Sequence, residues 1–386
     1  MNRWPTMLLG QVCELVNGAP FKPSDWDGSG LPIVRIQNLN DRTKPFNYTS
    51  RRLSDQFRVK HGDTLLSWSG TPGTSFGCFR WDGPEAWLNQ HIFNVHLGAD
   101  VLPPFFIYQV NSKLEELIGK AHGGVGLQHI TKGALSSVRL TVPPLPEQER
   151  IVKLLDEADE LRKLRAQADR RTAALIPALF HEMFGDPATN PKGCRVARLD
   201  EVTTRVTDGV HQKPHYVTSG VPFISVRNIT TGRLLFDDCK FISREDHAKF
   251  TRRCKPENLD ILYTKVGATY GRPALVETAQ EFSIYVSVCL IKPNKNLIDP
   301  PFLAAALGTP ALKRQADRSI KGIGVPDLHL DQIQQFLVPV PPLPLQQEFA
   351  RRVTEIRALE AAQAASRLRL EALSQSMLHR AFNGEL

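Results

Sequence analysis

The sequence predicts an α+β protein with an internal repeat: two mainly β domains that carry short helices, and two long α-helices that form an antiparallel coiled coil with pseudo-two-fold symmetry. The repeat is visible in two motifs. Val-Pro-Pro-Leu-Pro occurs at 142–146 and at 340–344, and a Gly-x-Gly motif stands upstream at 124–126 and at 322–324. Both motifs recur at an offset of 198 residues. About forty residues with helical patterning and little Gly or Pro follow each proline-rich block.

The order of these motifs divides the chain into four segments. A chain of 386 residues is long enough for two or three ordinary domains. We expect a β domain at 1–142, a central coiled-coil helix with its proline-rich start at 143–185, a second β domain at 186–340, and a C-terminal coiled-coil helix with its proline-rich start at 341–386.

Two pairs of matched segments predict the strands of the β domains. Residues 30–39 match 220–229, and both alternate apolar and polar residues, which is the period of a half-buried strand. Residues 62–67 match 259–264, and each reads as a strand that enters a turn marked by glycine. The segments that we expect to be helical within the two domains are 104–119 and 301–318.

The two long helices carry apolar residues at spacings of three, four or seven, with Glu, Lys and Arg between them, which is typical of a coiled-coil seam. The residues that we expect to form this coiled coil or to bind partners are Leu154, Ala158, Leu161, Ala168, Leu175, Val353, Ile356, Leu359, Leu370 and Leu373. A proline at position 177 should kink the first helix near its end.

The length of the helices indicates that they pack against each other. A helix from Pro146 to Phe184 would span ~58 Å and would be unstable alone in water. We therefore expect an antiparallel pair with one β domain at each end. The alternative is that each helix folds back on its own domain.

Composition places limits on the class of protein. The formal net charge of +8 and the pI near 9.2 are compatible with a polyanionic partner but do not establish one. The six cysteines lie far apart without metal-ligand spacing, so we expect reduced thiols, no metal site and a cytoplasmic protein. No apolar run approaches the ~20 residues of a membrane span, and we expect neither a signal peptide nor a membrane partner.

Catalytic motifs are missing from the sequence. We find no P-loop, no GxGxxG after a strand, no HExxH, no GxSxG and no amino-methyltransferase tetrapeptide, so we expect no catalytic residues. Residues 208–211, Asp-Gly-Val-His, could supply an acid and a base, but we favour a polar surface turn because no nucleophile is near in sequence. Other scattered acids, such as Asp63 and Asp260, are expected to cap turns.

Four motifs together resemble the specificity subunit of type I restriction-modification systems. The segment 124–151 resembles the end of a target-recognition domain that runs into the first central helix, and 180–193 resembles the exit from that helix. Residues 208–216 resemble the opening of the second recognition domain, and 381–386 resemble the family's C-terminus. The resemblance covers essentially the whole chain and rests on the order and duplication of these motifs.

The resemblance implies a non-catalytic subunit with two target-recognition domains. Each domain would read one half of a bipartite site in double-stranded DNA, and the helices would set the spacer length and dock two methylation subunits. Two restriction subunits would join the full complex, a type I site-specific deoxyribonuclease and adenine-specific DNA methyltransferase that restricts unmodified DNA. The chain would bind no cofactor itself: S-adenosylmethionine would belong to the methylation subunit, and ATP and Mg to the restriction subunit.

Physical chemistry indicates which residues could contact DNA. Lys and Arg neutralise phosphates, while Arg reads guanine and Asn or Gln reads adenine in the major groove. The predicted DNA-binding residues are Lys22, Arg35, Gln37, Asn38, Ser67, Ser69, Thr71, His211, Lys213, Arg227, Asn228, Lys265, Thr269, Tyr270 and Arg272. The alternative for each is a strand end or turn in solvent. We expect Trp26, Trp68, Trp81 and Trp87 to be core residues.

Two other functions remain to be distinguished. A fused restriction-methylation enzyme would need a cofactor-binding loop and a much longer chain. A two-module coiled-coil scaffold that binds protein or carbohydrate would show no affinity for duplex DNA.

Overall fold

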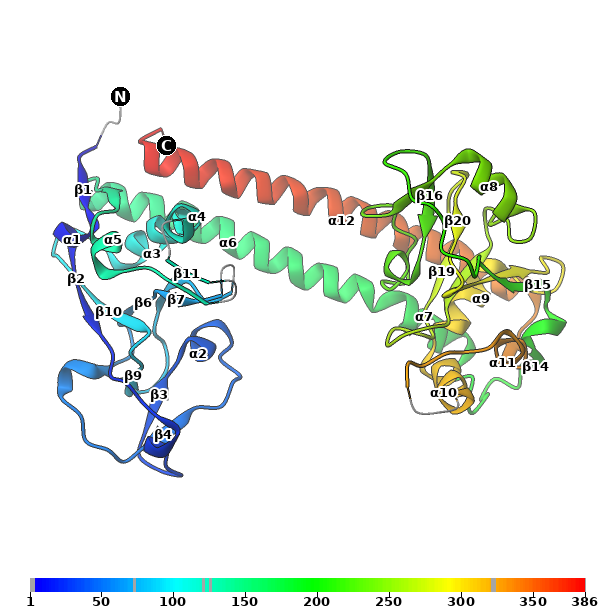
Figure 1. Cartoon of the computed structure of the whole chain (residues 1–386), viewed down its shortest axis with the longest axis horizontal. Helices are drawn as coiled ribbons and strands as arrows, with labels where there is room; N and C mark the ends of the chain where they lie inside the picture. Colours follow the sequence, from blue (N-terminus) through cyan, green and yellow to red (C-terminus); the bar gives the residue numbers. More distant parts are fainter. Residues whose placement is uncertain (1–3, 72–73, 120–121, 125–126, 321–323, 386) are drawn as a thin grey trace. The chain divides into compact units, whose positions relative to one another are not determined.

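The computed structural model describes residues 4–71, 74–119, 122–124, 127–320 and 324–385. The chain forms two compact units, which we describe separately. Unit 1 comprises Met1–Arg165 together with Ala365–Leu386, and unit 2 comprises Ala166–Ala364. Figure 1 colours the chain by sequence, and the C-terminal residues, in red, are part of unit 1.

Each unit contains a four-stranded antiparallel sheet with the same connectivity. The strand order is β2-β10-β6-β8 in unit 1 and β15-β21-β18-β19 in unit 2. Every residue of β6 and of β18 is buried, as expected for inner strands covered on both faces. The bounds are β2 Cys13–Asn17, β6 Thr64–Ser67, β8 Gly77–Arg80, β10 Ile92–Leu97, β15 Thr203–Asp208, β18 Ile261–Thr264, β19 Pro273–Leu275 and β21 Val288–Pro293.

A second sheet in each unit contains one parallel pair of strands. Its order is β4-β3-β9-β5 in unit 1 and β17-β16-β20 in unit 2, and β3 runs parallel to β9 as β16 does to β20. The matching orders confirm the internal repeat. The bounds are β3 Leu31–Val34, β4 Asn47–Thr49, β5 Arg58–Val59, β9 Ala86–Leu88, β16 Val221–Ile224, β17 Lys240–Ile242 and β20 Ser283–Ile284.

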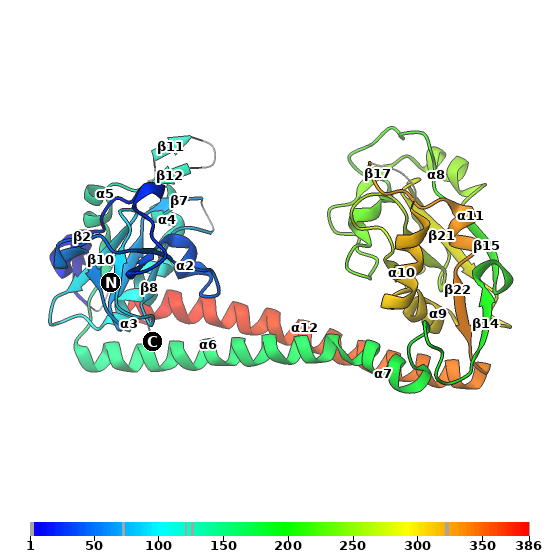
Figure 2. The same ribbon diagram turned by 90° about the horizontal axis from the view of Figure 1, so that it is seen from below.

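Shorter ladders complete the β structure. In unit 1, β1 (Thr6–Leu8) pairs with β13 (Arg139–Thr141), and in unit 2, β14 (Arg195–Arg198) pairs with β22 (Leu337–Val340). Unit 1 also has a sheet of β11 (His122–Gly124), β12 (Leu127–His129) and β7 (Ser69–Gly70). Figure 2 shows β11 and β12 on the side of unit 1 that lies away from α6. Among the residues described at the corresponding place in unit 2, Val266 and Asp327 form an isolated β-bridge.

The helices expected at 104–119 and 301–318 are each divided into two. Lys113 leaves the helical conformation after α3, and Thr309 caps α10 with its hydroxyl while Pro310 begins that helix. The helical bounds are α1 Leu9–Val12, α2 Ile36–Asn40, α3 Pro103–Ser112, α4 Leu114–Gly119, α5 Lys132–Ser136, α8 Arg244–Thr251, α9 Pro300–Leu307, α10 Pro310–Ser319 and α11 Leu330–Gln334. Short 3-10 turns are η1 Pro23–Asp25, η2 Asp55–Phe57, η3 Leu199–Glu201 and η4 Val226–Asn228.

The long helices follow the proline-rich blocks. They are α6 (Leu145–Ala173), its continuation α7 (Leu175–Phe184), and α12 (Leu343–Asn383). The break at Ala174 has the expected cause, because Pro177 has no N–H to donate to the carbonyl of residue 173 and its ring crowds that turn. Among the described residues, none of the helices combines the length and apolar character needed to cross a bilayer.

Contacts within each unit show that the long helices run antiparallel. In unit 1, Ile151 and Leu155 of α6 pack with Ala381 and Phe382 of α12. In unit 2, the ring centroids of Phe180 and Phe349 lie 5.8 Å apart. The alternative that each helix folds back on its own domain is therefore wrong: α6 begins in unit 1 and continues as α7 in unit 2, while α12 begins in unit 2 and ends in unit 1.

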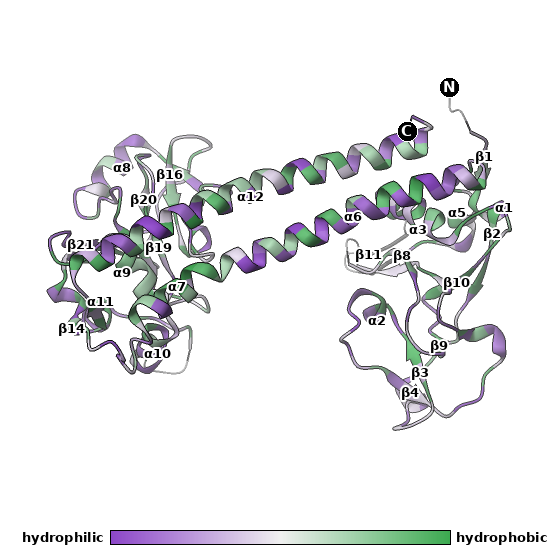
Figure 3. Cartoon of the chain, turned by 180° about the vertical axis from the view of Figure 1, so that it is seen from behind, coloured by the Kyte–Doolittle hydropathy of each residue, from purple (hydrophilic) through white to green (hydrophobic). Residues whose placement is uncertain are grey.

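The seam between the helices is more polar than the sequence predicted. Thr172 and Gln363 are buried, and the Gln363 amide donates to the Thr172 hydroxyl at 3.0 Å. In unit 1, the guanidinium of Arg162 lies 3.2 Å from the carboxylate of Glu371. Figure 3 shows hydrophilic residues along much of α6 and α12.

Several of the leucines predicted for the coiled coil or for partner binding are exposed and do not fill the seam. The exposed positions are Leu161, Leu175, Leu359 and Leu373. The half-buried positions are Leu154, Ala158, Ala168, Val353, Ile356 and Leu370. The physical reason is that polar side chains such as Thr172 and Gln363 bond to each other across the pair and fill space in the seam that we expected leucines to fill.

A buried glutamine fixes the start of each long helix to its unit. The Gln148 side chain accepts a hydrogen bond from the Leu102 N–H at 2.8 Å and donates to the carbonyls of Asp100 and Pro143 at 2.7 and 2.8 Å. Both residues that flank it in the motif differ between the copies, but this glutamine is repeated.

The second copy repeats this arrangement at the same offset. The Gln346 side chain accepts from the Asp299 N–H at 2.8 Å and donates to the carbonyls of Pro341 and Leu297 at 2.7 and 3.4 Å. Both glutamines have zero exposed area, so each amide satisfies backbone groups that water cannot reach.

Each globular core is completed by the end of the other copy's helix. In unit 1, Phe382 at the end of α12 packs edge-to-face on Phe105 of α3 with centroids 5.6 Å apart. In unit 2, Phe184 at the end of α7 packs in the same way on Phe302 of α9 at 4.8 Å. Burying such aromatic pairs contributes about 0.5–1.5 kcal/mol each beyond the area removed from water.

We predict that Gln346→Leu destabilises unit 2 by ~2–4 kcal/mol, because leucine has nearly the same size but leaves the Asp299 N–H and two carbonyls unpaired in the interior. Guanidinium unfolding followed by fluorescence measures the change. Gln347→Leu is the matched control: that neighbouring glutamine is exposed, and its replacement should change stability by at most about 0.5 kcal/mol. Equal effects of the two changes would contradict the assigned role of Gln346.

Candidate nucleic-acid interface

In unit 1 the end of β6, the start of β10 and the end of β12 lie together, and we name this place the strand-end edge. Trp68 directly follows β6, and its N–H donates to the carbonyl of His91, which precedes β10, at 3.3 Å. The Ile130 N–H, just after β12, donates to the Trp68 carbonyl at 2.9 Å. Three separate segments therefore present their side chains at one place.

The strand-end edge of unit 2 has the same backbone frame. The Lys265 N–H, after β18, donates to the Ser287 carbonyl at 3.0 Å, and the Leu328 N–H donates to the Lys265 carbonyl at 2.9 Å. Lys265 thus stands where unit 1 has Trp68, and Ser287 where it has His91. The two edges share a backbone and differ in side-chain chemistry.

A glycine beside each edge allows two strands to approach closely. A Cβ at Gly18 would lie 2.3 Å from the Leu88 carbonyl oxygen, and one at Gly209 would lie 2.0 Å from the Ile284 carbonyl oxygen. A larger residue would push the strands apart. The residues just before these glycines, Asn17 and Asp208, are thereby held at the edge.

Aromatic and basic groups meet at the edge of unit 1. The Trp68 ring is stacked on Phe93 at 5.6 Å and lies 5.8 Å from the His91 ring. The Arg35 guanidinium lies over the Trp26 ring, 5.5 Å from its centroid, and donates to the Asn47 side-chain oxygen at 3.1 Å. Stacking on the indole fixes the direction of this cation.

Of the five buried polar atoms of unit 1 that lack a hydrogen-bond partner within the described part of the chain, three belong to residues at this edge: Trp68 Nε1, Gln90 Oε1 and His91 Nδ1. Burial lowers the pKa of His91, and the nearby Arg35 and His129 lower it further. The imidazole is therefore neutral at pH 7 and can both donate and accept a hydrogen bond. Unpaired buried groups are costly in the free protein, so a ligand that paired with them would remove that cost.

An ion cluster occupies the edge of unit 2. The Asp208 carboxylate is only 3% exposed and contacts Arg253, Lys265 at 3.7 Å and His211 at 3.2 Å. Lys265 also lies 3.5 Å from Asp327. Because two permanent cations share this carboxylate with His211, the arrangement supports the polar turn that we favoured over an acid-base pair. Within the described residues, no group of three His, Cys, Asp or Glu side chains is placed to hold a metal ion.

Five of the predicted DNA-contacting residues are buried in the structure: Asn38, Ser67, Ser69, Asn228 and Lys265. The asparagines act as turn caps. Asn38 Oδ1 accepts the Arg35 N–H at 3.1 Å, and Asn228 Oδ1 accepts the Ser225 N–H at 3.1 Å. The Ser67 hydroxyl donates to the Ser75 carbonyl, and Ser69 lies in β7. Short polar side chains that follow a strand bond to the nearby backbone more readily than they extend into solvent.

The other predicted residues lie at the surface or partly buried. The exposed ones are Lys22, Gln37, Thr71, His211, Lys213, Arg227 and Arg272, and the half-buried ones are Arg35, Thr269 and Tyr270. The Tyr270 hydroxyl donates to Asp317, and Arg272 donates to the Thr230 carbonyl. Their contact with DNA stays a prediction.

The sequence analysis did not predict several of the side chains that lie at the two strand-end edges. Trp68 was assigned to the core, and its position between Ser67 and Ser69 after a matched strand could have indicated an edge residue. Arg253 and His91 lie in segments without a match in the other copy, and His129 lies just after the repeated Gly-x-Gly motif but has Asp327 at the corresponding position of the second copy. The expected turn residues Pro72 and Gly73, and the motif positions Val125, Gly126, Gly322 and Ile323, lie outside the described residues.

Comparison with known proteins identifies the family. The family described as "Type I restriction modification DNA specificity domain" matches residues 1–169 and 191–368. The chain belongs to this family. The two matched ranges each contain one β domain and most of the long helix that follows, so the type I specificity domain occurs twice.

Individual relatives agree with this membership in the type I specificity family. The type I restriction enzyme EcoBI specificity subunit of Escherichia coli is 26% identical over 422 residues, covering 99% of this chain and 86% of the relative. The S subunit structure from M. genitalium has a TM-score of 0.59 at 16% identity and covers 98% of this chain and 96% of its own. A chain solved in work on complex assembly and conformational transition of the type I R-M system has a TM-score of 0.64 at 19% identity, with 99% and 98% coverage.

The comparisons confirm the resemblance inferred from the motifs. They support the type I specificity family over the two alternatives, a fused enzyme and a coiled-coil scaffold that binds protein or carbohydrate.

We predict that Asn38→Ala and Asn228→Ala each lower the free energy of unfolding by ~1–2 kcal/mol, because each removes a side chain that caps a buried turn. The exposed neighbours provide matched controls: Gln37→Ala and Arg227→Ala should change stability by at most about 0.5 kcal/mol. Urea unfolding measures all four. If the asparagine variants were as stable as the controls, their role as caps would be rejected.

Proposed function

We propose that this chain is the non-catalytic specificity subunit of a type I restriction-modification complex, and that each unit reads one half of a bipartite target in duplex DNA. The observation that carries this proposal is the duplicated strand-end edge. One backbone frame bears aromatic and imidazole groups in unit 1 and an ion cluster in unit 2. Two strand-end edges that share a backbone arrangement but carry different side chains are suited to reading two different base sequences.

The chemistry of unit 1 supports contact with base edges. Trp68 Nε1 is a donor without a partner, Gln90 Oε1 is such an acceptor, and neutral His91 can serve as either. Nearby, Arg35 and Gln37 are the residue types that pair with guanine and adenine in the major groove. Base edges could satisfy these groups on binding.

In unit 2, Arg253 and His211 are the candidate readers. Both side chains are more than half exposed, and both are anchored on the buried carboxylate of Asp208. Anchoring limits the rotamers of the guanidinium before DNA arrives, so less entropy is lost on binding. We assign Lys265 to holding this carboxylate in place, and Arg227 and Lys213 to phosphate or base contacts.

The long helices supply surfaces for other subunits. Exposed leucines at 161, 164, 359, 368 and 373 are large apolar side chains that a partner could cover. We assign them to two methylation subunits, which would bring S-adenosylmethionine to a flipped adenine. Two restriction subunits, which use ATP and Mg, would complete the complex in the cytoplasm, and the helices would set the spacer.

Methylation mapping tests the proposal. The chain is expressed with its neighbouring methylation subunit in a methylation-free host, and modified adenines are located by sequencing. We expect a bipartite motif with a fixed gap that is absent when the chain is omitted. Arg253→Ala should weaken discrimination at one base by ~1–3 kcal/mol in one half-site, because it removes the anchored guanidinium.

Gln37→Ala is the matched control in the other unit, and it should weaken discrimination between bases in the opposite half-site only. A stable complex that modifies no adenine would contradict the proposed function. If either single change weakened base discrimination in both half-sites, the assignment of one half-site to each unit would be contradicted.

An insertion tests the helices as a ruler. Four residues added after Ala168 in α6, with four added after Gln363 in α12 to keep the antiparallel register, lengthen each helix by about 6 Å. We expect a longer spacer, by one or two base pairs at about 3.4 Å each, with both half-sites unchanged. Methylation mapping reads out the gap. An unaltered spacer in a folded, active complex would reject the ruler.

A further inference from the structure

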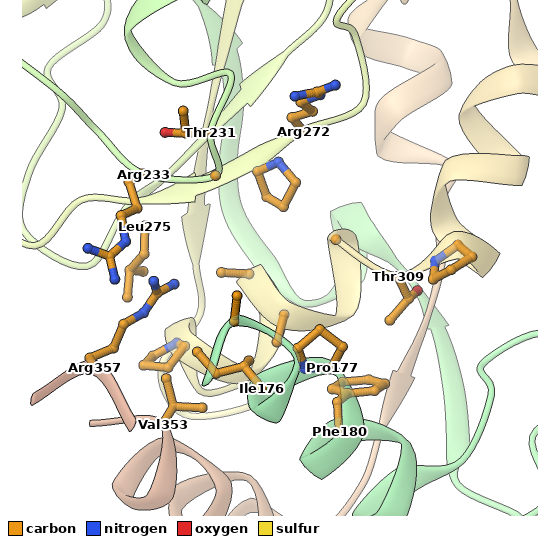
Figure 4. Close-up of a pocket in the computed structure, with 18 of the residues that line it drawn as sticks. Ile176, Pro177, Phe180, Thr231, Arg233, Arg272, Leu275, Thr309, Val353 and Arg357 are labelled. Carbon is orange, nitrogen blue, oxygen red and sulfur yellow. The ribbon is translucent and has the colours of Figure 1, made fainter. Parts of the chain in front are cut away.

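Unit 2 contains a cavity of about 1040 Å³ that is lined by α7, α9, α12 and the loop 230–233. Its floor is apolar, with Ile176, Phe180, Leu275 and Val353, while Arg233 and Arg357 stand at one side (Figure 4). The volume is at the upper end of the range for small-molecule sites and is sufficient for a short peptide segment.

The repeat shows what occupies the corresponding place in unit 1. Because Gln148 bonds to the Leu102 N–H and Gln346 to the Asp299 N–H, the two copies can be aligned residue by residue from these contacts. Six residues after Leu102 and Asp299 stand Tyr108 and Ala305, respectively. The first unit therefore has a phenol ring where the second has a methyl group and a cavity.

The helix residues that face this position also differ. Asp156 and Asp159 follow Gln148 by eight and eleven residues, and Thr354 and Arg357 follow Gln346 at the same distances. In unit 1 the Tyr108 hydroxyl donates to Asp156 at 2.8 Å and to Asp159 at 3.2 Å. Burial and these carboxylates raise the pKa of Tyr108, so the phenol keeps the proton that it donates.

Charge is reversed in the unit 2 cavity. Arg357 replaces an aspartate, and it lies 3.1 Å from Glu360, which also pairs with Arg233. Two guanidinium groups share the Glu360 carboxylate there, while the other carboxylates of the lining belong to Glu277 and to Asp186, which pairs with Arg314. An occupant that replaced the missing ring and also carried an acidic group would complement the apolar floor and give the two guanidinium groups a second carboxylate partner.

We propose that the unit 2 cavity receives a segment of the methylation subunit that inserts an aromatic side chain against Val353 and Phe180 and pairs an acidic residue with Arg357. The inference rests on the proposed function, because that function supplies the partner. It adds that the two partner sites are not equivalent. The site at unit 1 is filled by the chain's own Tyr108, whereas the site at unit 2 is completed by the partner.

The double variant Ala305→Tyr/Arg357→Asp introduces the tyrosine and one of the two facing aspartates of unit 1, so that the phenol ring occupies the place proposed for the partner's aromatic side chain. Titration of the purified chain with methylation subunit, followed by native mass spectrometry, measures both binding steps. We expect one subunit to bind as in the wild type and the other to bind at least tenfold more weakly. Ala248→Tyr, at an exposed alanine of α8 outside the cavity, is the matched control and should change neither step.

Unchanged binding of both subunits by a folded double variant would overturn the inference and leave the proposed function intact. If the wild-type chain bound no methylation subunit, both the inference and the proposed function would be overturned. Circular dichroism and thermal unfolding establish that the variant is folded.

A second measurement does not depend on that variant. Photo-crosslinking from p-benzoylphenylalanine in place of Thr231, at the cavity rim, is carried out in the purified complex, and the linked peptide is sequenced. A methylation-subunit segment with an aromatic residue next to an acidic one is expected. A segment without these residues, or no crosslink to that subunit, would overturn the inference.

Discussion

The side-chain amide buried at the start of each long helix is the contact on which the rest of the architecture depends. Gln148 and Gln346 use both their oxygen and their nitrogen on backbone groups of the adjoining domain, with no exposed area. A proline-rich block just before a helix leaves carbonyls that the helix cannot satisfy. The glutamine satisfies one of them and at the same time bonds to the loop before α3 or α9. The direction in which each helix leaves its domain is fixed by hydrogen bonds as well as by apolar packing.

The repeat separates what must stay the same from what can vary. The sheet orders, the glutamine and the aromatic pair at the helix end recur in both units. The side chains at the strand-end edges do not: Trp68 becomes Lys265, and the imidazole of His91 becomes the hydroxymethyl group of Ser287. Edge residues contribute little to the core, so they can change without loss of the fold. This separation suits a protein whose two halves share a scaffold and read different sequences.

Much of the fold was accessible from the sequence because it depended on repeated patterns. The offset of 198 residues, the alternating strands and Pro177 led to the repeat, to β6 and β18, and to the break between α6 and α7. Exposure of single side chains was less accessible. Gln37 and Asn38 are neighbours of similar chemistry, yet only the asparagine caps a turn and is buried. Periodicity favoured Leu161 for the seam, while the structure buries Thr172 with Gln363, because paired polar groups can pack as well as leucines. The cavity of unit 2 became apparent only when Tyr108 and Ala305 were aligned through the structure.

The exchange of helix ends between the two copies has a consequence for the order in which the protein is made. Unit 2 is one continuous stretch of chain, whereas unit 1 needs residues from both ends. The first β domain leaves the ribosome long before Phe382 is synthesised. The apolar side chains of Trp4 and Phe105, which pack in one cluster with Phe382, therefore stay exposed to solvent during most of translation. Unit 2 can fold while the chain is still attached to the ribosome. Unit 1 can close only after the C-terminal part of α12 has been synthesised.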